Sequence, residues 1–323
     1  MSAAGPAPVL AALDIGTNSV HLLVARPLGG GRFETLTRAR EVVRLGHGGG
    51  EMTELADDAV ERGLGALRRM RDVADRHHAA LRAVATSAVR EAANAAGFID
   101  RARREAGVDI DVISGTEEAR LIYLGVLQAL PVLDRRVLVI DVGGGSTELL
   151  IGQHTEVLAV RSLKLGAVRL TDRFFPAGRV SPAAVNAARS HIGERLAQFT
   201  HHVAEHGFEV AVASSGTAET ITRITGAARG RSRPVTGREA RFSAIELDTA
   251  ATELCRHRGA ASRATVAGLD PHRADIIVAG ALILAGVAEA FGVEEFRYSD
   301  GALREGVLVD AWRRLGGTDA SAP

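Results

Sequence analysis

The sequence has 323 residues, 46% of them hydrophobic, which is enough chain for two packed domains. Its 39 basic and 39 acidic residues cancel, which excludes binding to nucleic acid or to a membrane surface through overall charge. The single cysteine, Cys255, excludes an internal disulfide, and no secretion signal opens the chain, so we expect a cytoplasmic protein.

The first half of the chain alternates between strand and helix patterns. Apolar residues 9–13 and 20–25 flank a polar segment, which predicts a β-hairpin with a polar tip. The elements expected after it are strands at 33–45, 81–85 and 108–113 and helices at 53–78, 89–106 and 116–130. Thr116 is the expected N-cap of the last helix. This alternation predicts an α/β layered domain.

The opening pattern then returns. Residues 11–25 (AALDIGTNSVHLLVA) align with residues 138–152 (LVIDVGGGSTELLIG). The matched pairs include Asp14 with Asp141, Gly16 with Gly143, and Ser19 with Ser146. We interpret this match as an internal duplication, which predicts two related halves whose polar hairpin tips face one another across a cleft.

The second half also reads as α/β. Its expected elements are strands at 137–140, 148–152, 155–163 and 209–213 and helices at 183–206, 218–225, 243–257, 276–288 and 302–315. The apolar helix at 276–288 is shorter than the roughly 20 residues of a membrane span and predicts a buried core helix. Five arginines without an apolar period, within residues 226–241, predict an exposed loop.

These patterns predict two domains. We expect the first to hold residues 1–131, with helix 302–315 packing back on it, and the second to hold residues 132–299. Residues 316–323 are expected to form a disordered tail.

The glycine-rich segment DVGGGST, at residues 141–147, carries the sharpest chemical signal. Gly143, Gly144 and Gly145 allow backbone amides to approach an anion, and Ser146 and Thr147 add hydroxyl donors. We therefore expect this loop to cradle a phosphate. The alternative is a tight hairpin turn that needs glycine for a positive φ.

The duplicate loop, DIGTNS, offers donors of the same kind. Its candidate phosphate-binding residues are Asp14, Gly16, Thr17, Asn18 and Ser19. Two such loops suggest a clamp on opposite sides of one phosphoryl group, and Asp14 and Asp141 are available for a divalent cation.

Two predicted helix starts add charged candidates. Glu117 and Glu118 are adjacent, so they point about 100° apart and at most one aims into a cleft. Arg90 lies near a helix N-terminus, where backbone amides favour anions. The alternatives are that the two glutamates only complement the helix dipole and that Arg90 is a solvated surface residue.

Eight segments form an ordered set over nearly the whole chain. They are DIGTNS at 14–19, TSAVREAAN at 86–94, ISGTEEARLIY at 113–123, DVGGGSTEL at 141–149, SLKLGAVRLT at 162–171, SSGT at 214–217, RADIIVAGALIL at 273–284 and SDGALREG at 299–306. This set resembles the exopolyphosphatase and guanosine pentaphosphate phosphohydrolase (Ppx/GppA) family.

The resemblance implies two ribonuclease-H-like domains of the actin, sugar kinase and heat-shock ATPase superfamily, with a cleft between them. It also implies that Glu118 is the general base and that Asp141 and Glu148 serve a metal, Mg²⁺ or another divalent cation. Arg90 would hold phosphates together with both loops. Longer relatives carry an extra C-terminal helical domain that this sequence lacks, which puts processive action on long polymers in doubt.

The leading hypothesis is an exopolyphosphatase that releases terminal phosphate from short polyphosphate by Mg²⁺-assisted water attack. The alternative is 5′-phosphate hydrolysis of guanosine pentaphosphate. A kinase of the same superfamily is less favoured, because the short SSGT motif offers few residues for binding adenosine. A non-catalytic sensor is also less favoured, because such a protein should have lost one of the acidic residues of the site. Either substrate is the expected partner, without nucleic acid or membrane, and a homodimer stays open.

Overall fold

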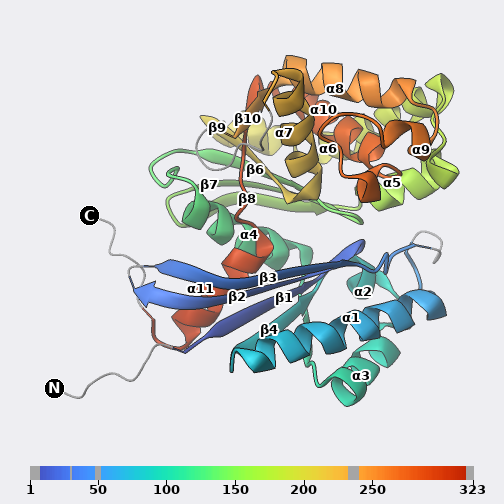
Figure 1. The fold of residues 1–323 in the computed structure, drawn as a ribbon. Helices are drawn as coiled ribbons and strands as arrows, with labels where there is room; N and C mark the ends of the chain where they lie inside the picture. Colours follow the sequence, from blue (N-terminus) through green and yellow to red (C-terminus); the bar gives the residue numbers. More distant parts are fainter. Residues whose placement is uncertain (1–7, 30, 48–51, 232–239, 318–323) are drawn as a thin grey trace. The chain divides into compact units, whose positions relative to one another are not determined.

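The computed structural model describes residues 8–29, 31–47, 52–231 and 240–317 (Figure 1). The chain forms two compact units, called unit 1 (Met1–Gln128 with Gly301–Pro323) and unit 2 (Ala129–Asp300). Within the described ranges, no helix is both long and apolar enough to cross a membrane.

Unit 1 is built on a five-stranded sheet. Its strands are β1 (Leu10–Ile15), β2 (Ser19–Gly29), β3 (Arg32–Val42), β4 (Ala80–Ala85) and β5 (Ile110–Val112). Their order is β3-β2-β1-β4-β5, in which β1, β2 and β3 pair antiparallel while β4 and β5 continue parallel to β1.

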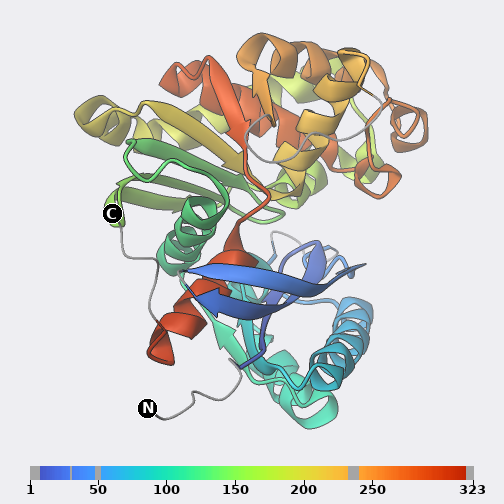
Figure 2. The same cartoon turned by 60° about the vertical axis from the view of Figure 1, so that its left-hand side comes forward.

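Helices cover both faces of this sheet. They are α1 (Asp57–Arg76), α2 (Ser87–Glu91), α3 (Ala95–Ala106), α4 (Gly115–Ala129) and α11 (Leu303–Arg314). Figures 1 and 2 show α1 and α3 together on one side of the sheet and α11 on the other. The core alternates along the strands: Leu13 and Ile15 of β1 pack with α1 and α3, as period-two burial requires.

Unit 2 repeats this plan. Its strands are β6 (Val137–Val142), β7 (Thr147–Gln153), β8 (Glu156–Leu163), β9 (Val210–Ser214), β10 (Arg241–Ser243) and β11 (Glu295–Tyr298). The order β8-β7-β6-β9-β11 matches β3-β2-β1-β4-β5 in position and direction, and β10 extends the edge. The predicted duplication is confirmed, and so is the fold class of two ribonuclease-H-like domains.

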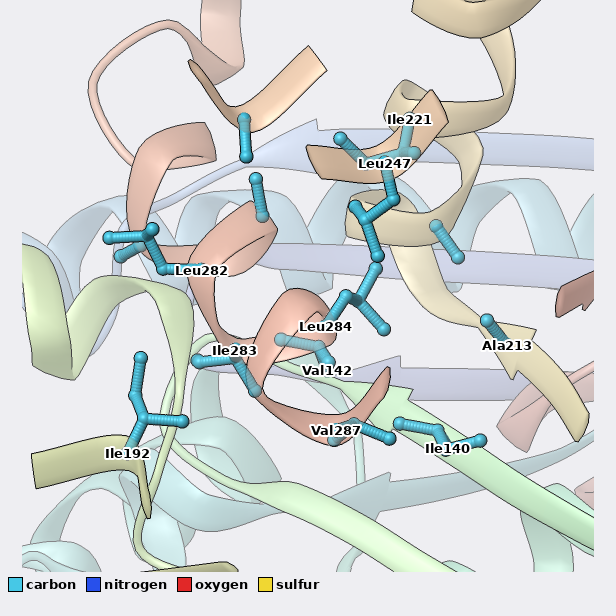
Figure 3. Close-up of a cluster of buried hydrophobic side chains, with 14 of the residues drawn as sticks. Ile140, Val142, Ile192, Ala213, Ile221, Leu247, Leu282, Ile283, Leu284 and Val287 are labelled. Carbon is cyan, nitrogen blue, oxygen red and sulfur yellow. The ribbon is translucent and has the colours of Figure 1, made fainter. Parts of the chain in front are cut away.

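The core of unit 2 is organised around a helix that is apolar on every side. The helices of this unit are α5 (Ala167–Phe174), α6 (Pro182–His206), α7 (Ser215–Ala228), α8 (Ala244–Arg256), α9 (Ala260–Arg263) and α10 (Ile277–Phe291), with 3₁₀ turns at Pro176–Gly178 and Pro271–Arg273. Figure 3 shows Ile283, Leu284 and Val287 of α10 among Ile140 and Val142 of β6. The predicted core helix at 276–288 is confirmed.

Two predictions about elements need correction, and four elements were not predicted. The single helix expected at 89–106 is two helices, because Ala92 is extended and the Asn94 side chain exchanges two 2.9 Å hydrogen bonds with the backbone of Leu55. Ser114, not Thr116, caps α4: its Oγ accepts from the Glu117 N–H at 3.1 Å. Helices α5 and α9 and strands β10 and β11 were not predicted.

The predicted arginine-rich loop lies partly outside the described residues. Helix α7 continues to Ala228, and Arg241 already belongs to β10. Arg229 binds both carboxylate oxygens of Glu246 at 2.5 Å, so this arginine has a structural role. Most of the expected tail, residues 318–323, also lies outside the described ranges.

Candidate functional site

The candidate residues of unit 1 begin at one edge of its sheet. In the strand register Ile15 lies beside Ala85, and Ala85 lies beside Val112. The Thr86 N–H donates to the Ile15 carbonyl at 3.2 Å, and the Ile113 N–H donates to the Ala85 carbonyl at 3.2 Å. The three motif segments that start at residues 14, 86 and 113 therefore leave the carboxyl ends of adjacent parallel strands, where α/β sheets bind ligands.

The loop at residues 14–19 is held in place through its carbonyl groups. Val43 and Arg44 donate their N–H groups to the Asn18 carbonyl at 3.0 and 2.8 Å, and Gly46 donates to the Thr17 carbonyl at 2.9 Å. A side chain at Gly46 would overlap the Thr17 methyl group, so glycine is required there by the close approach. With its carbonyls engaged, the loop can offer an anion its N–H groups and the hydroxyls of Thr17 and Ser19.

Asp14 faces His21 rather than a second acid. The two residues are direct partners in the β1–β2 register, so their side chains lie on the same face of the sheet. Arg304 of α11 places Nη1 3.4 Å from His21 Nδ1 on that face. Unit 1 therefore has one carboxylate where unit 2, as described below, has two.

Arg90 and Glu118 lie together at this edge. Arg90 Nη1 donates to Glu118 Oε2 and to the Ile113 carbonyl, each at 2.9 Å. The side chains are only 22% and 9% exposed, so Arg90 is not a solvated surface residue. A guanidinium has five N–H donors on three nitrogens, so Arg90 can hold Glu118 through Nη1 and keep two nitrogens for a phosphoryl oxygen.

Glu117 points elsewhere, as the geometry of a helix requires. Its carboxylate binds Arg120 at 2.7 and 2.8 Å, and Arg120 also donates to Asp310 of α11 at 2.7 Å. Arg82 of β4 reaches the second oxygen of Asp310 at 2.5 Å. Burial would raise the pKa of Asp310, but the hydrogen bonds from Arg120 and Arg82 outweigh it and lower that pKa. Glu117 is therefore part of a structural ion-pair network.

The glycine loop of unit 2 repeats the turn of unit 1. The Gly143 N–H donates to the Ser146 carbonyl at 3.0 Å, and the Gly16 N–H donates to the Ser19 carbonyl at 3.1 Å. Gly143, Gly144 and Gly145 are all described, and none has a positive φ. The alternative of a turn that needs glycine for its φ is therefore wrong.

The carbonyl groups of this loop bind the start of α5. Ala167 and Val168 donate their N–H groups to Gly143 and Gly144 at 2.9 and 2.8 Å, and Arg169 Nε donates to the Gly145 carbonyl at 2.8 Å. The glycines thus permit a close approach of two backbone segments. Helix α5 was missed from the pattern, although Gly166 followed by an amphipathic run is a usable signal.

Asp141 and Glu148 form the acidic pair of unit 2. They are direct cross-strand partners, and they are only 9% and 2% exposed. Ser214 Oγ donates to Asp141 Oδ2 at 2.5 Å, and Ser162 Oγ donates to Glu148 Oε1 at 2.7 Å. Two facing buried carboxylates destabilise a sheet unless a cation or proton compensates them. Carboxylate oxygens are the ligands that Mg²⁺ prefers, so the pair fits a divalent cation.

Two residues near this pair serve the backbone. Thr147 is fully buried and its hydroxyl donates to the Leu165 carbonyl, so its predicted role as a phosphate donor is corrected to that of a structural residue. Ser215 has a φ of 80° and donates its hydroxyl to the Val142 carbonyl at 2.9 Å. Sequence reasoning missed this serine and Ser214, although the SSGT motif contains both.

Comparisons with known proteins agree on one family. The model of the Ppx/GppA phosphatase family matches residues 23–315. The guanosine-5′-triphosphate,3′-diphosphate pyrophosphatase of Vibrio cholerae is 34% identical over 330 residues, which cover 100% of this chain and 63% of that protein. The chain thus spans less than two thirds of the length of that curated relative.

Solved structures extend the agreement to the whole fold. An exopolyphosphatase from Cytophaga hutchinsonii superposes with a TM-score of 0.87 at 28% identity, covering 96% of this chain and 99% of that one. The Ppx/GppA family member of Aquifex aeolicus gives a TM-score of 0.79 at 27% identity, with coverages of 97% and 100%. On the strength of the family match and these superpositions, the chain belongs to the Ppx/GppA phosphatase family.

Proposed function

We propose that this protein is an exopolyphosphatase, which hydrolyses the terminal phosphoanhydride bond of inorganic polyphosphate and prefers short chains. The observation that carries the proposal is the pair of buried Glu118 and half-buried Arg90 at the carboxyl edge of a sheet, where a proton acceptor and a cation suited to phosphate lie in hydrogen-bond contact. Such a pair suits water attack on a phosphoryl group.

Glu118 accepts the proton of the attacking water in this mechanism. The new bond forms between the water oxygen and the terminal phosphorus, and the bridging P–O bond breaks. Inorganic phosphate and a polyphosphate shortened by one unit are the products. Arg90 holds the Glu118 carboxylate in place through Nη1, while its other nitrogens hold a phosphoryl oxygen.

The loops and the acidic pair supply charge stabilisation. In each loop carbonyl groups are engaged by neighbouring segments, while Gly16 and Gly143 use their N–H groups to close the turns. The other N–H groups of the loops and the hydroxyls of Thr17, Ser19 and Ser146 bind phosphoryl oxygens. A divalent cation held by Asp141 and Glu148 would neutralise negative charge that develops on the phosphate oxygens. Ser214 and Ser162 orient those two carboxylates from the side.

The preference for short chains is supported by charge. The sequence carries 39 basic and 39 acidic residues, so attraction of a polyanion depends on local donors and not on the field of the whole chain. Donors confined to two loops and one arginine suit the end of a phosphate chain better than a long run of it.

Guanosine pentaphosphate is the second candidate substrate. The identity of 34% to the Vibrio cholerae protein named as a guanosine-5′-triphosphate,3′-diphosphate pyrophosphatase favours it. The reacting atoms are the same, so the two substrates differ only in how the protein treats a nucleoside. A sensor without turnover is less favoured, because Asp14, Glu118, Asp141 and Glu148 are all present.

The test is phosphate release measured in parallel from short polyphosphate, long polyphosphate, guanosine pentaphosphate and ATP. Each is assayed with Mg²⁺ and with excess chelator. We expect short polyphosphate to be fastest and chelator to abolish release. Faster release from chains of hundreds of units would refute the length preference, and fastest release from guanosine pentaphosphate would establish the second candidate. Transfer of label to a sugar or acid acceptor would show a kinase instead.

A further inference from the structure

The last turn of α6 carries three metal-ligating side chains outside the proposed active site. His202, Glu205 and His206 stand at positions i, i+3 and i+4, so they share one face of the helix. One ligand atom of each residue can be chosen so that all three atoms lie within 4.8 Å of one another. None of the sequence motifs described above includes these residues.

The arrangement of the three side chains suits a single small ion. The rings of His202 and His206 are nearly parallel, with 8° between their planes and 6.4 Å between their centroids. Glu205 Oε2 lies 3.9 Å from His206 Nε2. Two imidazole nitrogens and one carboxylate oxygen form a donor set that Zn²⁺ binds in proteins, with a fourth position left for water.

We propose that His202, Glu205 and His206 form a surface Zn²⁺ site that is separate from the acidic pair Asp141 and Glu148. The site is reachable from solvent, since the Glu205 side chain is 65% exposed and that of His206 is 25% exposed. Its imidazole ligands also distinguish it from the all-oxygen pair, which suits Mg²⁺.

The two sites lie at opposite ends of one strand. Arg136, the residue before β6, donates a hydrogen bond to the His206 carbonyl. Asp141 lies five residues further along the same extended segment, and a strand rises about 3.3 Å per residue, so Asp141 lies roughly 17 Å from Arg136 along β6. An ion at the α6 site therefore cannot share ligands with the acidic pair.

Two electrostatic contributions act on a cation at this position. Helix α6 ends at His206, and the negative end of the helix dipole attracts cations. The positive charge of Arg161 acts on His202 and opposes the binding of a cation.

The competing explanation is that these histidines only complement the helix dipole when protonated. In that case the chain would bind no metal there, and each histidine would contribute to the stability of α6 independently of Glu205. His201 separates the two explanations. Its ring contacts that of His202, tilted by 40° at a centroid distance of 3.7 Å, but His201 does not belong to the group of three.

The test titrates Zn²⁺ into the full chain, made without an affinity tag and stripped with chelator. Excess Mg²⁺ is kept present to occupy oxygen-ligand sites. Calorimetry should show one Zn²⁺ per chain. His202→Ala and His206→Ala should each weaken binding by at least about tenfold, the loss already known for outer partners of metal ligands. Co²⁺ should give a visible absorption band that both variants lose.

His201→Ala is the matched control and should leave Zn²⁺ affinity unchanged. Circular dichroism of each variant checks that α6 is still folded, and Glu205→Gln provides a milder change if a histidine variant unfolds. The proposal is overturned if the natural chain binds no Zn²⁺, if His201→Ala weakens binding as much as His206→Ala does, or if the double variant at positions 202 and 206 retains the affinity. None of these readouts depends on phosphatase activity.

Discussion

Arg90 Nη1 and Glu118 Oε2 are 2.9 Å apart and join α2 to the first turn of α4. A second bond from the same nitrogen to the Ile113 carbonyl fixes the arginine against the strand end. The proposed base is thus held by a cation at the edge where the loop at residues 14–19, the proposed anion-binding loop of unit 1, begins. Substitutions of Glu118 and of its neighbour Glu117 should therefore have different effects on activity.

Glu118→Gln should lower the rate of phosphate release by about 10² to 10⁴, because the amide cannot accept a proton from water. KM should change little, since side-chain size and a hydrogen bond to Arg90 are preserved. Steady-state kinetics on short polyphosphate would measure both constants. A near-normal rate would remove Glu118 from the mechanism and direct the search for a base to Glu148.

Glu117→Gln is the matched control one residue away. This variant loses the bidentate ion pair with Arg120. The side chain of Arg120 is 36% exposed and that of Glu117 is 31% exposed, and ion pairs at the surface contribute about 0–1 kcal/mol to the free energy of unfolding. The rate should therefore stay near that of the natural protein while the melting temperature falls slightly. A larger loss of rate here than in Glu118→Gln would contradict the assignment.

Asp141→Asn should abolish turnover and also abolish stabilisation by Mg²⁺. In the natural protein, Mg²⁺ bound at the proposed site would relieve repulsion between two facing buried carboxylates, so it should raise the unfolding temperature. The asparagine removes that repulsion without metal, so the metal-free variant should be no less stable than the metal-free natural protein. Thermal unfolding with Mg²⁺ and with chelator checks this, and an equal Mg²⁺ increment in both proteins would refute the site.

Glu148→Gln should impair activity far more than His21→Gln does. The two positions correspond in the duplicated hairpins, but only Glu148 faces an acid that would share a metal, whereas His21 lies beside Arg304. The Mg²⁺ concentration for half-maximal activity should rise in Glu148→Gln and stay constant in His21→Gln. Equal sensitivity of the two variants would mean that the metal site is not asymmetric.

Glu246→Gln should destabilise the protein near neutral pH but not in acid. Chiefly because of its hydrogen bond from Arg229, the pKa of Glu246 is lowered from 4.5 to about 2. A carboxyl group whose pKa is lower in the folded state than in the unfolded state stabilises the folded protein at pH values above the unfolded-state pKa. That stabilisation is lost as the pH falls toward the folded-state pKa. The cost should be about 1 kcal/mol near neutral pH, as for a helix cap, and should shrink between about pH 4.5 and about pH 2.

Denaturant unfolding at several pH values would measure that difference. Glu219→Gln is the control, because Glu219 belongs to an exposed i,i+4 pair with Arg223 that should contribute little at any pH. A constant cost of Glu246→Gln across the whole range would show that its charge plays no part.

The sequence alone determined the repeated hairpins. Strand pairing across a short polar turn depends on local features, namely turn residues and period-two burial, and these are readable in DIGTNS and DVGGGST. For the same reason the cross-strand partners of Asp14 and Asp141 follow from the register. The apolar helix α10 was also predictable, because a helix apolar all round has to be buried.

Only the tertiary structure decided which side chains meet. The contact between Arg90 and Glu118 requires β4 and β5 to lie side by side, and the break before α3 depends on Asn94 reaching Leu55, 39 residues earlier. The start of α5 is positioned by carbonyl groups of a glycine loop more than 20 residues earlier in the chain. The Arg169 side chain likewise binds the Gly145 carbonyl of that loop. Such contacts carry no local signature, because packing between distant segments, and not propensity or pattern, selects them.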